Sequence, residues 1–260
     1  MSEELKKIAT RDGFGEEILK LGLENPEIMI VDADIGKSCK TGAFRKELSA
    51  EYHEDKNQYV NVGIAEQNAA GVAAGLATCG KIPFVVTYAV FGSLRMCEMI
   101  RQEICYTNLN VKIACSHGGV TPANDGASHQ AIEDMGVLRS IPNMTVMMPA
   151  DYVSAKKLTR AAAETDGPMY LRFTRDAIPQ IYDESVELVI GKAHQMSHAP
   201  ILRKGRFVIP PLNLTHDKLW QRCQQLDLGM LRRCFAQQVI CVRQFDFLDL
   251  IPGQISDPAI

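Results

Sequence analysis

The sequence of 260 residues lacks several features, and each absence narrows the kinds of protein that it encodes. No apolar run approaches the roughly 20 residues of a bilayer-spanning helix, which argues against an integral membrane protein. The formal net charge is only −3, so we expect no strong attraction to nucleic acid or to an anionic membrane. Residues 1–17 are charged and lack the apolar core of a signal peptide, which predicts a cytoplasmic protein.

Other familiar patterns are also missing. None of the eight cysteines belongs to a Cys-x-x-Cys pair, so we expect reduced thiols and no metal site of the zinc type. No Gly-x-Gly-x-x-Gly or P-loop occurs between a strand and a helix, which weakens the interpretation as a nucleotide-binding Rossmann domain. What remains is ordinary for a globular protein, with 46% hydrophobic and 23% charged residues. The length allows one large or two small domains.

Short apolar runs alternate with helical patterns between residues 27 and 174. This alternation predicts the α/β class with a mostly parallel sheet, although periodicity does not give the strand order. We expect strands at residues 27–34, 81–87, 111–116, 144–149 and 169–174. We expect helices at residues 3–24, 66–79, 93–106, 131–139 and 150–164, and a loop with a short helix at 36–58.

The stretch NVGIAEQNAAGVAAGLATC, residues 61–79, predicts a buried helix whose small residues let other backbone come close. Glu66 lies where this helix begins. A carboxylate there is costly to desolvate unless something binds it, which indicates a functional role. Alternatively, Glu66 only complements the helix dipole, and the local sequence leaves both interpretations open.

The segment VGIAEQNAAGVAAGLA resembles the glutamate segment of the pyrimidine-binding domain of thiamine-diphosphate enzymes. It looks closest to the C-terminal part of a transketolase that is split into two chains. Five further segments match in the family's order and at fitting spacings: DADIGK, VTYAVFGSLRMCEMIR, SHGGVTPANDGASHQ, PNMTVMMPAD and YLRFTRDAIP. The resemblance covers roughly residues 5–190, and it implies a doubly wound, mostly parallel sheet with helices on both faces.

The resemblance also implies which residues would hold thiamine diphosphate. This cofactor reacts through a carbanion that its own aminopyrimidine generates once the ring nitrogen N1′ is bonded to a carboxyl group, and Glu66 matches that carboxyl. Tyr88 and Phe91 match two aromatic positions beside the pyrimidine; we favour Phe91 as the stacking ring, with core packing as the alternative. Asp34 matches an acid near the cofactor and the subunit interface, or else it is a turn residue.

Substrate contacts are implied for the segment SHGGVTPANDGASHQ and for FTRD. His117, Asp125 and His129 match positions that contact sugar hydroxyls, and the two histidines are also candidate catalytic proton carriers, with a structural role as the alternative. Arg175 matches the arginine that holds the sugar phosphate, for which a permanently charged guanidinium is well suited. Asp176 replaces a glutamine of longer transketolases, and an ion pair between Asp176 and Arg175 is the alternative.

The resemblance therefore implies a transketolase subunit that transfers a two-carbon ketol unit between sugar phosphates, as in the pentose phosphate pathway. The family's G-D-G…N segment, which binds Mg²⁺ and the cofactor's diphosphate, is absent. An N-terminal partner chain would supply it, so we expect the chain to be inactive alone and to join an α2β2-type assembly. The alternatives are a subunit of deoxyxylulose-phosphate synthase or of a 2-oxo-acid dehydrogenase β type, or a non-catalytic truncated remnant.

The last 66 residues differ in composition from the rest. From Gln195 onward there is no Glu and no Tyr, whereas Gln and Arg are frequent. We therefore divide the chain into a pyrimidine-binding domain at residues 1–190 and a divergent, truncated or frame-shifted tail at 191–260. The tail stands where a transketolase carries its C-terminal domain. A shift of reading frame near residues 196–198 is one hypothesis, and a genuine divergent tail is the other.

Overall fold

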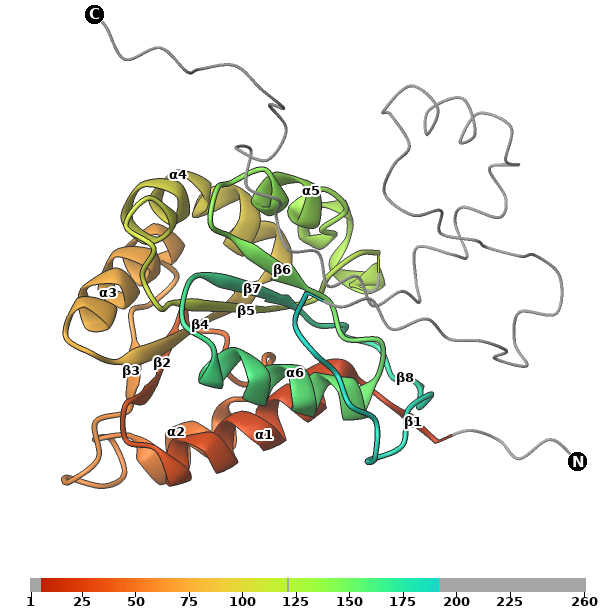
Figure 1. The fold of residues 1–260 in the computed structure, drawn as a ribbon, viewed down its shortest axis with the longest axis horizontal. Coiled ribbons are helices and arrows are strands. Elements are labelled where there is room, and N and C mark those ends of the chain that lie inside the picture. Colours follow the sequence, from red (N-terminus) through yellow and green to blue (C-terminus); the bar gives the residue numbers. More distant parts are fainter. Residues whose placement is uncertain (1–5, 121, 192–260) are drawn as a thin grey trace, which may run out of the picture.

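The computed structural model describes residues 6–120 and 122–191. The tail after residue 191, and with it the hypothesis of a shifted reading frame, lies outside the described residues. Within them, six strands form one parallel sheet in the order β3-β2-β4-β5-β7-β6 (Figure 1). The strands are β2 (Ile28–Asp32), β3 (Tyr59–Asn61), β4 (Ile82–Tyr88), β5 (Lys112–Ser116), β6 (Thr145–Met147) and β7 (Met169–Arg172).

The sheet confirms the predicted class and five of its strands. Strands β2, β5 and β7 are buried at every position, because helices cover both faces of the sheet. Such strands consist largely of apolar residues, which the sequence shows as short apolar runs, although Lys112 and Arg172 are buried in β5 and β7. The sixth strand, β3, was not predicted: it is three residues long, only partly buried and at the edge of the sheet.

Helices cover the sheet in two layers, as Figure 1 shows. One layer consists of α1 (Thr10–Glu24), α2 (Gly42–Leu48) and α6 (Tyr152–Glu164), which pack Phe14, Phe44 and Leu158 against the sheet. The other consists of α3 (Glu66–Thr78), η1 (Phe91–Arg95), α4 (Cys97–Met99), η2 (Ile100–Cys105) and α5 (Asp134–Arg139). Two short 3-10 turns, η3 (Ala123–Asp125) and η4 (Ala127–His129), lie in the long loop after β5.

Two helices differ from their predicted form. The helix expected at residues 3–24 begins only at Thr10, because Lys7–Ile8 form strand β1, which pairs antiparallel with β8 (Ile178–Pro179). The segment expected as one helix at 93–106 contains two π-helical stretches, η1 and η2, around the short α4. A π-turn is wider than an α-turn, and such turns occur frequently at functional sites.

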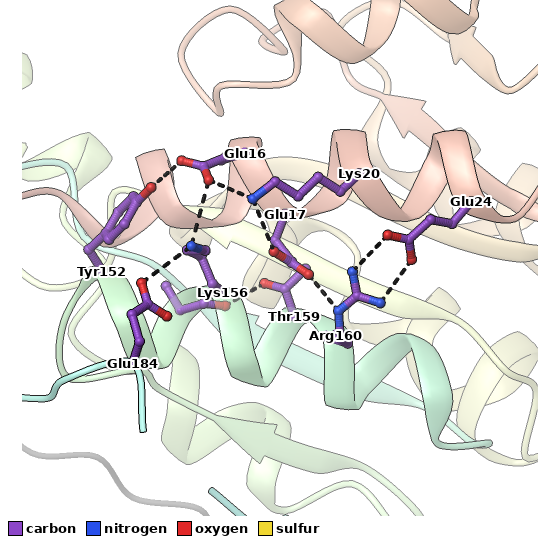
Figure 2. A network of polar contacts seen from close by, with 10 residues as sticks. Glu16, Glu17, Lys20, Glu24, Tyr152, Lys156, Thr159, Arg160 and Glu184 are labelled. Atoms are coloured by element: carbon purple, nitrogen blue, oxygen red, sulfur yellow. Dashed lines mark hydrogen bonds and ion pairs between the residues drawn. The ribbon is translucent and has the colours of Figure 1, made fainter. Parts of the chain in front are cut away.

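A network of charged side chains joins α1 to α6 on the surface (Figure 2). Arg160 donates through Nε to Glu17 over 2.6 Å and through its two terminal nitrogens to Glu24. Glu16 accepts hydrogen bonds from Lys20 and from the Tyr152 hydroxyl, and it forms an ion pair with Lys156 at 3.6 Å. This network fixes how two helices of one layer lie against each other, on the face of the sheet opposite α3.

The order of the strands indicates the edge of the sheet at which a ligand would bind. The chain leaves β2 toward β3 on one side and leaves β4 toward β5 on the other, so the strand order reverses between β2 and β4. In open α/β sheets, ligands bind outside the carboxyl ends of the strands at such a point. The loops at this edge carry nearly all the residues that the sequence singles out.

Candidate active site

Glu66 is the first residue of α3, and its side chain is almost completely buried, at 3% exposure. Arg95 covers it: Nη1 of Arg95 donates to both carboxylate oxygens, at 2.9 and 2.8 Å. The carboxylate thus has both a helix N-terminus and a cation beside it. The position of Glu66 at the helix start follows from the sequence pattern, whereas its contact with Arg95 does not.

Arg95 is the last residue of η1, and Phe91 is the first. The guanidinium carbon of Arg95 lies over the Phe91 ring, 4.6 Å from its centroid, while the side chain stays 48% exposed. Gly92 allows η1 to approach the sheet this closely, because a Cβ at this position would lie 2.4 Å from Cys115 Sγ. The π-helical segment therefore presents an aromatic face beside the buried carboxylate.

Four aromatic side chains form one cluster at the carboxyl edge of the sheet. The ring of Tyr88, at the end of β4, lies with its centroid 4.1 Å from that of His117 and 6.2 Å from that of Phe91. His129 approaches Phe91 edge-on, with their centroids 5.3 Å apart. The structure thus brings together Tyr88, Phe91, His117 and His129, which the sequence places on two separate segments.

His117 is held in one orientation. It directly follows β5, has a positive φ of 63° and is 2% exposed. Its Nδ1 lies 2.8 Å from Ser116 Oγ, and that hydroxyl lies 3.2 Å from the thiol of Cys39. Burial, followed by the positive charges of Arg11 and Arg175, lowers the pKa of His117 to about 4. The ring is therefore neutral at physiological pH, with Nδ1 facing Ser116.

Arg175 and Asp125, expected as separate substrate contacts, bind each other. Nη1 of Arg175 donates to Asp125 Oδ2 and to the backbone oxygen of Pro122, both at 3.1 Å. Asp125, and not Asp176, is thus the carboxylate partner of Arg175 among the described ion pairs. Both side chains are about one-third exposed, so the pair closes the long loop over the end of β7 but remains open to solvent.

Arg11 also lies at this site, although no motif in the sequence points to it. It lies at the start of α1 and donates from Nη1 to the backbone oxygen of Ser38 at 3.0 Å. Its Nε is buried and has no hydrogen-bond partner among the described residues. Its positive charge acts on His117, as that of Arg175 does, so the three side chains lie in one region.

Asp34 lies in the loop after β2 and is exposed, with a positive φ of 65°. Its carboxylate accepts from Asn61 Nδ2 at 2.9 Å, which links the ends of β2 and β3. The neighbouring Asp32 is buried and accepts from the backbone of Ile35 and Gly36. Asp32 therefore has the turn-stabilising role, whereas Asp34 faces outward at the edge that carries the aromatic cluster.

A buried network fixes the far end of the histidine-bearing loop. Tyr170 Oη donates to Asp134 Oδ2 at 2.6 Å, and Arg172 Nε donates to the same oxygen at 2.8 Å. Arg172 Nη2 also donates to the backbone oxygen of Ala131 at 2.7 Å. Because Ala131 and Asp134 follow closely after His129, this network sets where the loop returns to the sheet.

The arrangement suits a flat, nitrogen-containing ring. Such a ring could stack on Phe91 and bond through a ring nitrogen to the Glu66 carboxylate, both of which lie at one edge of the sheet. The residues described here contain no group of three or more His, Cys, Asp or Glu able to hold a metal ion. None of the helices in the same residues has the length and hydropathy that crossing a bilayer requires.

Known proteins resemble this chain over the same region. The family model described as transketolase, pyrimidine binding domain, matches residues 6–180. A protein of Methanocaldococcus jannaschii designated a transketolase C-terminal section is 42% identical over 184 residues, which are 70% of this chain and 56% of that protein. One of the subunits of the apulose-4-phosphate transketolase of Phocaeicola vulgatus is 37% identical over 190 residues, covering 73% of this chain and 59% of the relative.

A solved structure described as a split gene transketolase, inactive beta4 tetramer, has the same fold. It superposes with a TM-score of 0.61 at 44% identity, covering 72% of this chain and 58% of that one. The chain thus spans a little more than half the length of these relatives.

Proposed function

The chain belongs to the family defined by the transketolase pyrimidine-binding domain, and on this basis we propose that it is the C-terminal subunit of a two-chain transketolase. The reaction would move a two-carbon ketol unit from a ketose phosphate to an aldose phosphate. Two of the relatives are themselves named as a C-terminal section and as one subunit of a transketolase, which supports a chain that works with a partner.

The buried Glu66 carboxylate beside the Phe91 ring is the observation that carries this proposal. Thiamine diphosphate, when bound, supplies the nucleophilic carbon to which the two-carbon unit becomes attached. Glu66 would hold a hydrogen bond to the pyrimidine nitrogen N1′, and Phe91, with Tyr88 behind it, would support the ring. A carboxylate in a dry pocket suits this task because no water competes for it.

The substrate would lie against the loop after β5. His117 is neutral and buried, so it can donate or accept one hydrogen bond through Nε2 to a sugar hydroxyl. His129 and Asp125 lie on the same loop, in contact with Phe91 and Arg175 respectively. Arg175 and Arg11 would face the phosphate, and the unpartnered Nε of Arg11 supports a role as a further anion ligand.

A partner chain would complete the site. It would bring the Mg²⁺ and diphosphate contacts, for which the described residues offer no carboxylate cluster. Exposed apolar side chains adjoin the site residues in the sequence and would suit such an interface: Ile64, Leu94, Val120 and Ile132. We propose an α2β2-type assembly in the cytoplasm, in which Asp34 lies near the interface between chains. The division into a domain ending near residue 190 and a separate tail is part of this proposal.

The test is reconstitution with the N-terminal subunit, thiamine diphosphate and Mg²⁺, followed by an assay of ketol transfer. We expect no activity from this chain alone, activity from the mixture, and a loss of roughly a hundredfold or more for Glu66→Gln. Glu27→Gln is the matched control, because Glu27 pairs with Lys81 at the surface. A Glu66→Gln complex as active as the control would refute the proposed role.

A further inference from the structure

Arg95 makes both of the contacts that the proposed function assigns to the cofactor's pyrimidine. Its Nη1 bonds both oxygens of the Glu66 carboxylate, and its guanidinium lies over Phe91 with Cζ 4.6 Å from the ring centroid. A guanidinium is planar, delocalised and cationic, so it stacks on an aromatic face while donating to a carboxylate. A protonated or hydrogen-bonding heterocycle would need the same face and the same oxygens.

The two groups cannot occupy this place together. Glu66 is 3% exposed in the presence of Arg95, so an incoming ring has almost no access to the carboxylate. Arg95, by contrast, is 48% exposed and reaches the carboxylate from the solvent side. Arg95 is thus a long, half-exposed side chain bonded to the Glu66 carboxylate, and it can rotate into water without moving the backbone.

We infer that Arg95 is a placeholder for the pyrimidine of thiamine diphosphate. This inference rests on the proposed function. In the chain without cofactor, Arg95 keeps the buried carboxylate paired, which avoids the cost of an isolated buried charge. Cofactor binding then exchanges Arg95 for the pyrimidine on both Glu66 and Phe91. The exchange lowers the apparent affinity, because the binding-competent arrangement is only part of the population.

Arg172 is a buried arginine with several partners, and it contrasts with the half-exposed Arg95. Arg172 is 9% exposed and is held by Asp134, Ala131 and Met148 at once. Arg95 has one carboxylate and one ring face, both on the side where a ligand would arrive. In the exchange the pyrimidine takes the place of the guanidinium, so the buried carboxylate would not be left without a partner when Arg95 turns into solvent.

The experiment measures the dissociation constant of thiamine diphosphate by titration calorimetry. It uses the complex with the N-terminal subunit in Mg²⁺. We compare the unmodified chain with Arg95→Met, which keeps an unbranched apolar stem and removes the guanidinium. We expect Arg95→Met to bind the cofactor roughly tenfold more tightly, which corresponds to about 1.4 kcal/mol. Arg101→Met, at an exposed arginine of the same segment, should leave the dissociation constant unchanged.

Glu66→Gln separates this inference from the proposed function. If Arg95 acts by covering Glu66, Arg95→Met should give a much smaller gain in a Glu66→Gln chain than in the unmodified one. An Arg95→Met complex that binds the cofactor equally or more weakly overturns the placeholder role alone. A complex of the unmodified chain that binds no cofactor overturns the placeholder role and the proposed function together.

Arg95→Lys is a second variant, to be used if Arg95→Met does not fold. Thermal unfolding of each variant shows whether it folds. Lysine keeps the charge but cannot stack as a plane, so its complex should bind the cofactor more tightly than the unmodified complex. If Arg95→Met does not fold, an Arg95→Lys complex with unchanged or weaker binding overturns the inference.

Discussion

Arg172 and Asp134 form an ion pair inside the protein, with Nε and Oδ2 separated by 2.8 Å and side chains only 9% and 1% exposed. One partner lies on β7 and the other begins α5. Their bond therefore joins the sheet to the point where the loop bearing His117 and His129 ends. Removing either side chain of this pair should therefore lower the stability of the fold, and it should change the candidate site only through the position of the loop.

We expect Asp134→Ala to lower the free energy of unfolding by about 3–5 kcal/mol, because it leaves the Arg172 charge buried without its carboxylate. Urea denaturation of the purified chain would measure this loss. The control is Glu27→Gln, which removes a surface partner of Lys81 and should change stability by less than about 0.5 kcal/mol. Equal effects of the two variants would mean that the buried pair contributes no more than a surface pair.

Close approach of η1 to the sheet gives a second prediction. Gly92→Ala should lower the free energy of unfolding by about 1–3 kcal/mol, because the new methyl group meets Cys115 Sγ and Thr87 Cγ2. Cys115→Ala removes the sulfur, so the double variant should lose less than the sum of the single variants. Gly75→Ala is the control: it lies on α3 with open space around it and should stabilise by up to about 1 kcal/mol.

NMR titration of the His117 ring would measure how the neighbouring charges change its pKa. Burial and the nearby Arg11 and Arg175 lower its pKa to about 4. Arg11→Gln should therefore raise the pKa of His117, whereas Arg45→Gln, which removes a surface arginine paired with Glu51, should not. Since the folded pKa lies below the unfolded value of about 6.5, His117 should reduce stability as the pH falls from about 6.5 to 4.

Lys112 provides a prediction at higher pH. Its ammonium group is buried at the start of β5 and donates to the backbone oxygens of Thr165 and Gly167, each at 2.7 Å. Burial lowers the pKa of Lys112 to about 7. The unfolded chain then binds more protons than the folded one between pH 7 and about 10.5, so stability should rise with pH across this window.

Urea midpoints at pH 7, 8.5 and 10 would check this effect. Lys112→Met should lack the rise that the unmodified chain shows, and Lys46→Met, at a position on the surface helix α2, should keep it. A rise of the same size in all three chains would place its origin in other groups.

The parts of the fold that follow from local pattern were predictable. The buried strands are visible as apolar runs, and Asp151, directly before α6, is of a residue type that favours helix N-caps. It caps α6 through a capping box with Ser154, in which its Oδ1 accepts from the Ser154 amide at 2.8 Å. Strands β1 and β8 were missed because they consist of two residues each and exist only through pairing across most of the domain.

The candidate site was predictable in its positions but less so in its pairings. Glu66, Phe91 and His117 could be placed from the resemblance and the strand ends. The contact between Glu66 and Arg95 spans 29 positions and depends on a π-turn, which a search for the α-helical period does not find. Arg11 was missed because its position next to His117 depends on how α1 docks beside β7, where Thr10 and Thr174 bond each other.

The ladder between Lys7–Ile8 and Ile178–Pro179 has a practical consequence for engineering. It brings residues 7–8 beside residues 178–179, so a linker could connect the two ends of the sheet domain. The chain could then be opened at the exposed turn around residues 51–55, which belongs to no strand or helix. A circular permutant of this kind would keep every strand of the sheet and would move the new termini to the turn between α2 and β3.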